Sequence, residues 1–268
     1  MPGHDRGRAS GGGKVVRSKA DRASIRDEGA GKAQRRRAGT RTARVLSPRR
    51  RAPGALRIIA SEEDVREGVR ALRRRCATMR MVHDAAGDPP LRRRPAGFEG
   101  LARIIVGQQL SVASASAIWL RTASLCQPFE PLVMQQLEDV VLASAGLSRA
   151  KIRTLRAICA ACAEGLDLAA LDGHSDAEIQ TALTAINGIG PWTADIYIMF
   201  CLGRGDGFAA GDLALQIGAQ KALGLKARPS ADELLAIAER WRPWRGVAAR
   251  LLWNYYAHLK GLGRATPV

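Results

Sequence analysis

The feature that most constrains this chain is a glycine-rich turn between two stretches with helical spacing. Residues 183–195 read Leu-Thr-Ala-Ile-Asn-Gly-Ile-Gly-Pro-Trp-Thr-Ala-Asp. Gly188 and Gly190 permit the positive φ that a tight turn needs, and they let an anion approach the backbone amides. Pro191 suits the first position of a helix, where free amides attract negative charge. The pattern predicts a helical hairpin that binds a phosphate, although a corner between helices without a ligand also fits the two glycines.

The rest of the chain also favours helices. Apolar residues recur at helical spacing, and no stretch shows the sustained alternation of a β-strand. Three helix starts carry capping signals, which are Ser61 with Asp64, Ser175 with Glu178, and Ser230 with Glu233. Further apolar stretches lie at 98–124, 131–144, 149–164, 191–203, 212–223 and 244–260. We expect an all-α domain at residues 56–268, with about nine or ten helices, the first ending near residue 80.

Charge divides the chain into two parts. Of the net charge of +17, residues 1–57 hold +13, because 17 Lys and Arg accompany four acids there. The segment has no aromatic residue and is rich in Gly, Ser, Ala and Arg, so it cannot bury enough surface to offset the entropy lost on ordering. We predict a disordered basic arm at residues 1–55 and a polyanionic partner. A solubilising tail, a mis-assigned start or a transit peptide would also explain the arm.

The five cysteines are scattered, which suits a reducing compartment. Cys159 and Cys162 form a Cys-x-x-Cys pair within a stretch of helical spacing, and no second pair lies near them, so we expect core packing rather than metal binding. In this sequence no apolar h-region precedes a cleavage site, and no apolar run reaches the roughly 18 residues that span a membrane. We expect a soluble intracellular monomer with no metal, cofactor or membrane contact.

Three segments together carry a family resemblance. They are Val106-Gly-Gln-Gln-Leu-Ser111, Gly188-Ile-Gly-Pro-Trp-Thr-Ala-Asp195 and Gly211-Asp-Leu-Ala-Leu-Gln216. From about Leu91 to Gly261 the chain resembles the helix-hairpin-helix DNA glycosylases, and most closely their DNA-3-methyladenine glycosylase II branch. The resemblance implies two packed helical subdomains with a DNA site between them. It also implies double-stranded DNA with alkylated bases as the partner, bound at the nucleoid in a bacterial cytoplasm.

Asp212 is the candidate catalytic carboxylate. It stands between Gly211 and a helical stretch, which by itself is also the position of an ordinary helix N-cap. The resemblance implies that Asp212 stabilises the positive charge that grows on the sugar as the N-glycosidic bond breaks. It also implies that Asp212 can take a proton from the attacking water. An alkylated base is already cationic and leaves as a neutral molecule, so the reaction requires little general-acid help.

Trp192 indicates the type of reaction. Relatives with lyase activity carry a lysine at this position, whose amine forms a Schiff base, whereas this chain has an indole. The resemblance therefore implies a monofunctional enzyme with water as the nucleophile. Nine of the twelve aromatic residues fall within residues 192–256, and we predict a base pocket walled by Trp192, Tyr197 and Trp244. Each is also compatible with core packing, which we expect for Trp253.

Two segments are predicted to contact DNA. The phosphate-binding hairpin comprises Gly188, Ile189, Gly190 and Thr193. Gln108 and Gln109 match the family segment that fills the gap left by an extruded nucleotide, and Gln109 is the first candidate for this wedge. A role at the start of the next helix fits both glutamines as well. Lys151 and Arg245 are candidates for phosphate or structural contacts, although basic side chains commonly lie on solvated faces.

These features together predict a DNA glycosylase of base excision repair that hydrolyses the N-glycosidic bond of alkylated purines, 3-methyladenine and 7-methylguanine. The main rival is a helix-hairpin-helix module that only grips DNA, and the register of Asp212 argues against it. A glycosylase for oxidised or mismatched bases remains a third interpretation, because the sequence does not reveal the shape of the pocket.

Overall fold

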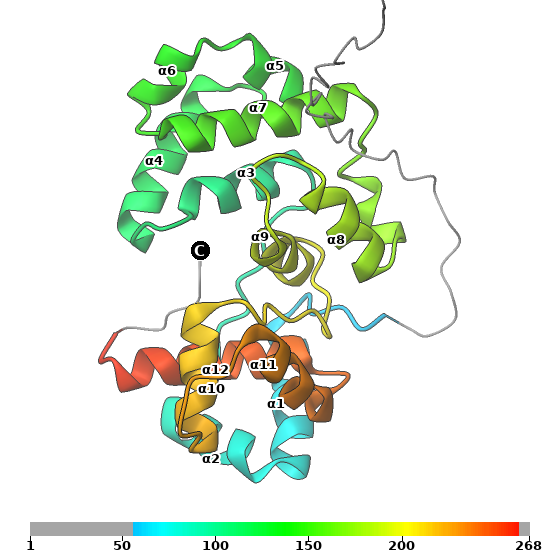
Figure 1. Ribbon diagram of the computed structural model, residues 1–268, viewed down its shortest axis with the longest axis vertical. Coiled ribbons are helices and arrows are strands. Elements are labelled where there is room, and N and C mark those ends of the chain that lie inside the picture. The colour runs from blue at the N-terminus through cyan, green and yellow to red at the C-terminus, as the bar shows by residue number, and fades with distance from the viewer. Residues whose placement is uncertain (1–55, 263–268) are drawn as a thin grey trace, which may run out of the picture. The chain divides into compact units, whose positions relative to one another are not determined.

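The computed structural model describes residues 56–262, and the predicted arm at residues 1–55 lies outside them. Twelve α-helices build this region (Figure 1). Within residues 56–262, pairing of the β type is limited to one isolated bridge between Ile58 and Arg204. The all-α prediction is therefore confirmed for the described part of the chain. No helix there is long and apolar enough to cross a membrane.

The first two helices arise from a stretch that the sequence pattern predicts as one. Helix α1 spans Glu62–Arg75 and helix α2 spans Ala77–Ala86. The backbone of Cys76 is extended, with φ −138° and ψ 110°, so it ends α1 and precedes α2. The predicted capping box is present, because Ser61 accepts from the Asp64 amide while the Asp64 carboxylate accepts from the Ser61 amide.

Five helices in the middle of the chain form one packed group. They are α3 (Phe98–Gly107), α4 (Val112–Leu125), α5 (Pro131–Gln136), α6 (Asp139–Ser144) and α7 (Arg149–Ala163). Helix α3 contacts α4 and α7, and α7 also contacts α5 and α6. The apolar stretches predicted at 98–124 and 131–144 each contain two helices, because turns after Gly107 and Gln136 interrupt them.

All five cysteines lie within the described residues and are free. Cys159 and Cys162 lie on α7, where burial raises the pKa of Cys159 to about 12 and that of Cys162 to about 11. A neutral thiol packs as a small apolar side chain, which agrees with the predicted core role. Residues 56–262 contain no group of three or more His, Cys, Asp or Glu side chains that would hold a metal ion.

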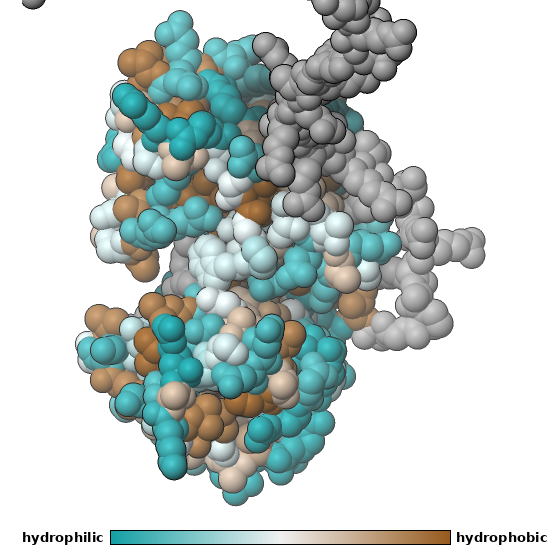
Figure 2. All heavy atoms as spheres, in the orientation of Figure 1, coloured by the Kyte–Doolittle hydropathy of each residue, from teal (hydrophilic) through white to brown (hydrophobic). Residues whose placement is uncertain are grey.

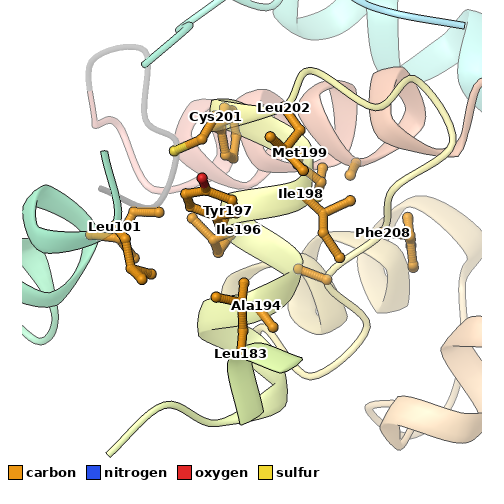
Figure 3. Close-up of a cluster of buried hydrophobic side chains, with 14 of the residues drawn as sticks. Leu101, Leu183, Ala194, Ile196, Tyr197, Ile198, Met199, Cys201, Leu202 and Phe208 are labelled. Atoms are coloured by element: carbon orange, nitrogen blue, oxygen red, sulfur yellow. The ribbon is translucent and has the colours of Figure 1, made fainter. Parts of the chain in front are cut away.

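The predicted hairpin joins α8 (Asp176–Thr184) to α9 (Pro191–Ile196). Helix α9 continues into a π-helical turn at Tyr197–Cys201, and every residue of that turn is buried. Figure 3 shows Leu101 of α3 lying opposite Tyr197 and the end of α9 in this core. The hairpin helix is therefore anchored against α3 by apolar burial, a strong and non-directional stabilisation.

A second group contains α10 (Leu213–Leu223), α11 (Ala231–Ala238) and α12 (Arg245–Leu259), which pack with α1 and α2 (Figure 1). Both groups belong to one compact unit. Helices α10 and α12 approach closely, since a Cβ added to Gly218 would lie 2.6 Å from the Leu252 carbonyl oxygen. Glycine at 218 thus permits direct contact between the two helices and brings side chains of α12 to the N-terminus of α10.

Candidate active site

Asp212 is the N-cap residue of α10, and its carboxylate accepts three hydrogen bonds. Oδ1 accepts from the Leu215 amide and from the Trp253 indole, both at 2.8 Å. Oδ2 accepts from the Trp192 indole, also at 2.8 Å. Only 7% of the residue is exposed. Three donors therefore replace the water lost by a nearly buried carboxylate, and they fix the direction in which it points.

Trp192 occupies the first turn of α9 and is partly exposed. Its hydrogen bond to Asp212 connects the hairpin helix to α10, so the two segments that carry the sequence resemblance meet in space. The indole places an aromatic surface beside the carboxylate. Such an arrangement suits a base that stacks on the ring while its sugar faces the negative charge.

Trp253 is the site residue whose role the sequence does not indicate. It lies on α12 with 1% of its surface exposed, in agreement with the expected core packing. Its indole N–H nevertheless donates to Asp212, which lies 41 residues earlier in the chain. A tryptophan within an apolar helical stretch carries no sequence signal for such a bond. The close approach of α10 and α12 creates it.

The two glycines of the hairpin differ in backbone conformation: Gly188 has the positive φ that the turn predicts, and Gly190 does not. Gly188 has φ +90°, and a Cβ added there would lie 2.0 Å from the Thr154 hydroxyl oxygen. Gly190 instead has φ −97° and ψ 173°, an extended backbone that any residue adopts, because it is the N-cap residue of α9. Ile189 is 5% exposed and packs into the core beneath the turn. Nothing lies within 4 Å of a Cβ added to Gly190, so this position is open to a ligand.

The predicted wedge lies on the turn between α3 and α4. Gln108 donates through Nε2 to the Thr193 hydroxyl at 2.9 Å, and Thr193 is only 2% exposed. These two predicted DNA-binding side chains therefore bind each other. Gln109, in contrast, is exposed and has φ +58°. On the face drawn in Figure 2, the surface is indented between α4 and the start of α10, the side on which Figure 1 places this turn.

Tyr197 and Trp244 do not line a pocket in this structure, which corrects the prediction for both. Tyr197 is fully buried, its hydroxyl accepts from the Gly97 amide at 2.9 Å and donates to the Leu168 carbonyl at 3.2 Å, and burial raises its pKa. Trp244 is 4% exposed, and the Arg57 guanidinium lies over its ring, 4.2 Å from the centroid. Protein atoms cover both rings, so a base cannot stack on them without rearrangement.

The two basic candidates make structural contacts. Lys151 donates through Nζ to the carbonyl oxygens of Val106 and Gln108, at 2.7 and 2.9 Å. Arg245 donates through Nε to the backbone and side-chain oxygens of Asp206, each at 3.1 Å. Of the two roles predicted for these side chains, phosphate contact and structural contact, the structure supports the structural role.

A second carboxylate lies three residues after Trp192. Asp195 accepts a hydrogen bond from Gln180 Nε2 at 3.0 Å. The pKa of Asp195 is raised to about 7, mainly by burial, while the hydrogen bond from Gln180 opposes the shift and the neighbouring Asp176 adds to it. A cavity of about 270 Å³ adjoins Asp195.

Comparison with known protein families agrees with this arrangement of helices and side chains. Residues 102–243 match the HhH-GPD superfamily base excision DNA repair protein, and they include the wedge turn, the hairpin and Asp212. The chain belongs to the HhH-GPD superfamily, whose fold its helices share.

Three known proteins are similar to this chain. The chain is 32% identical over 173 residues to a probable bifunctional transcriptional activator/DNA repair enzyme AlkA of Mycobacterium tuberculosis, covering 60% of this chain and 34% of that protein. It therefore spans about a third of that relative's length. A crystal structure of the Bacillus halodurans DNA-3-methyladenine glycosidase shares 32% identity and a TM-score of 0.63, covering 74% of this chain and 93% of that one. The Schizosaccharomyces pombe 3-methyladenine DNA glycosylase Mag1, in complex with abasic DNA, shares 26% identity and a TM-score of 0.65, covering 75% and 99%.

Proposed function

We propose that this protein is a monofunctional DNA glycosylase that excises alkylated purines, with 3-methyladenine and 7-methylguanine as the released bases. The observation that carries the proposal is the Asp212 carboxylate, held by three donors beside the partly exposed Trp192. The two structural neighbours are named as a 3-methyladenine DNA glycosylase and a DNA-3-methyladenine glycosidase, which supports this substrate class. The abasic DNA bound to Mag1 supports duplex DNA as the partner.

The geometry accounts for the chemistry. When the N-glycosidic bond breaks, its electron pair leaves with the cationic base, which becomes neutral, and positive charge develops at C1′ of the sugar. A carboxylate already fixed at this place stabilises that charge without reorganising, which lowers the barrier. Water then adds to C1′ and gives up a proton, which Asp212 accepts in the proposed arrangement. Three donors on the carboxylate of Asp212 make it a poor nucleophile, which favours attack by water.

Trp192 supports the monofunctional assignment, since an indole cannot form a Schiff base. The amine of Lys151 is held by two carbonyl oxygens of the α3–α4 region. We therefore expect that borohydride traps no covalent protein–DNA adduct above background during the reaction. An efficient adduct that maps to a lysine near the site would contradict the monofunctional assignment.

The activity is tested by incubating the protein with methylated genomic DNA and separating the released free bases by chromatography. A glycosylase for alkylated purines releases 3-methyladenine and 7-methylguanine, whereas a module that only binds DNA releases neither. Oxidised DNA and mismatched duplexes, treated in parallel, test the third interpretation. Release from those substrates alone would replace the proposed substrate class.

A further inference from the structure

The turn between α3 and α4 is held weakly by its own backbone. Its two backbone hydrogen bonds, from Gln108 to Ile105 and from Leu110 to Gly107, measure 3.3 and 3.4 Å, which is long. Gln109 has φ +58°, a left-handed conformation that is unfavourable for a residue with a side chain. Such a conformation persists only where the surroundings hold it.

Lys151 of α7 supplies that support from one side. Its ammonium group donates to the carbonyl oxygens of Val106 and Gln108, at 2.7 and 2.9 Å. These carbonyls flank Gly107, the last residue of α3, where helix carbonyls lack partners within the helix and attract a positive charge. Burial lowers the pKa of Lys151, which agrees with an amine directed into the protein.

Thr193 of α9 supplies support from the other side. Its hydroxyl accepts the hydrogen bond from Gln108 Nε2 at 2.9 Å, and it is itself 2% exposed. Helix α3 contacts both α7 and α9, and Figure 1 shows it between them. The start of the turn is thus fixed between Lys151 of α7 and Thr193 of α9, whereas Gln109 and Leu110 at its tip are exposed.

We propose that Lys151 is a positioning residue for nucleotide extrusion, because it holds the α3–α4 turn in the conformation that inserts Gln109 into the duplex. The inference rests on the proposed function, since it concerns the same site. Extrusion of a nucleotide loses stacking and base pairing, so a wedge must be held firmly to fill the gap. Lys151 acts through the backbone of the turn and contacts no DNA.

The test compares Lys151→Met with Arg153→Met, which removes a positive charge from an exposed position on the same helix. Single-turnover excision of one 7-methylguanine is measured in two duplexes, with cytosine or with an abasic site opposite the lesion. Extrusion breaks no base pair in the second duplex. We expect Lys151→Met to be at least about tenfold slower on the paired duplex and nearly unaffected on the other, because misplacing a positioned group by an ångström has effects of this size or larger.

A fluorescence measurement reports extrusion without excision. A 2-aminopurine beside a lesion with a 2′-fluorinated sugar, which resists cleavage, brightens when the lesion leaves the stack. We expect the wild type and Arg153→Met to produce this rise and Lys151→Met to produce much less. Lys151→Arg keeps the charge and the donors and is expected to restore most of it. Melting temperatures show that each variant is folded.

Two outcomes would overturn the inference. One is an equal loss of rate on the paired and unpaired duplexes, which would mean that Lys151 does not act through extrusion. The other is a change of about 0.9 in the slope of log affinity against log salt for Lys151→Met, the sign of a lost phosphate contact. A wild-type protein that releases no base contradicts the proposed function instead, and the fluorescence measurement then still tests the role of Lys151.

Discussion

Two carboxylates, the buried Asp212 and the partly buried Asp195, lie in contrasting surroundings. Asp212 accepts hydrogen bonds from two indoles and one backbone amide, which come from α9, α10 and α12. Asp195 accepts one from Gln180, and burial raises its pKa to about 7. A carboxylate taken out of water keeps its charge at low cost only where donors replace the solvent. The fold supplies three such donors at Asp212 and one at Asp195.

Asp212 lies in a site arranged to hold a negative charge, whereas at Asp195 a negative charge is unfavourable. At Asp212 three elements of the fold converge to fix a negative charge, which suits a group that stabilises positive charge in a transition state. At Asp195 ionisation opposes folding, so that region lowers stability at high pH. Substitutions at the two carboxylates should therefore act on different quantities, activity at Asp212 and stability at Asp195.

The largest expected effect is on the activity of Asp212→Asn. The amide oxygen in the place of Oδ1 still accepts from the Leu215 amide and the Trp253 indole, but the negative charge disappears, and the amide NH₂ in the place of Oδ2 faces the Trp192 indole N–H without bonding. Single-turnover excision should fall by about 100-fold to 1,000-fold, or roughly 3–4 kcal/mol. Melting temperature is the control for folding. A folded variant with more than about a tenth of the wild-type rate, a loss under ~1.4 kcal/mol, would leave Asp212 a helix cap only.

Trp253→Phe removes one of the three donors and leaves the carboxylate in place. We expect excision to slow by roughly tenfold to a hundredfold, because one side of Asp212 loses its fixed partner. Trp241→Phe is the matched control, since Trp241 is also buried but its indole N–H has no hydrogen-bond partner. Both variants leave a similar cavity. Equal losses of rate in the two variants would show that packing, and not the hydrogen bond, supports the site.

Asp195→Asn should change stability and leave activity near the wild-type value. The pKa of Asp195 is about 7 in the folded protein against 3.8 as its ordinary value, so the unfolded state binds fewer protons between these limits. Stability therefore falls as pH rises from about 4 to about 7 and stays lower above that. Asn removes this loss, and urea unfolding should show a gain on the order of 2 kcal/mol at pH 8, with partial exposure allowed for, and less at pH 5. The same gain at both pH values would contradict the raised pKa.

Gln180→Met should have the smallest effect. The bond from Gln180 lowers the pKa of Asp195, so its loss destabilises the ionised form of that carboxylate. We expect the variant to lose about 1 kcal/mol of unfolding free energy at pH 8 and less at pH 5, where Asp195 is protonated. Urea unfolding at the two pH values measures this. No difference between them would mean that the hydrogen bond does not stabilise the charge.

Much of the local structure follows from the sequence. The capping boxes at Ser61, Ser175 and Ser230 form as predicted, because such signals depend on residues within one helical turn. The break between the helices at Cys76, in contrast, does not follow from the sequence pattern. Apolar spacing continues through this residue, yet its extended backbone divides α1 from α2, a break that no glycine or proline announces.

The candidate site was partly predictable. Asp212 and Trp192 are adjacent to motifs, and the structure brings them to hydrogen-bond distance. Tyr197 and Trp244 were predicted as pocket walls because aromatic residues concentrate in that part of the chain. Composition does not distinguish an aromatic that lines a pocket from one that fills the core, and both are buried.

The sequence by itself determined the helical character of the chain, three of the helix caps, the hairpin turn and the place of Asp212 at the start of α10. These depend on backbone propensities and on contacts within a few residues. Only the tertiary structure decided which groups act together: Trp253 with Asp212 across 41 residues, Lys151 with Gln108 across 43, and Gln108 with Thr193 across 85. The physical reason is that hydrogen bonds between distant segments require helices to be brought together by apolar burial, which depends on area and not on direction. Where the polar groups meet is therefore fixed by how the core packs.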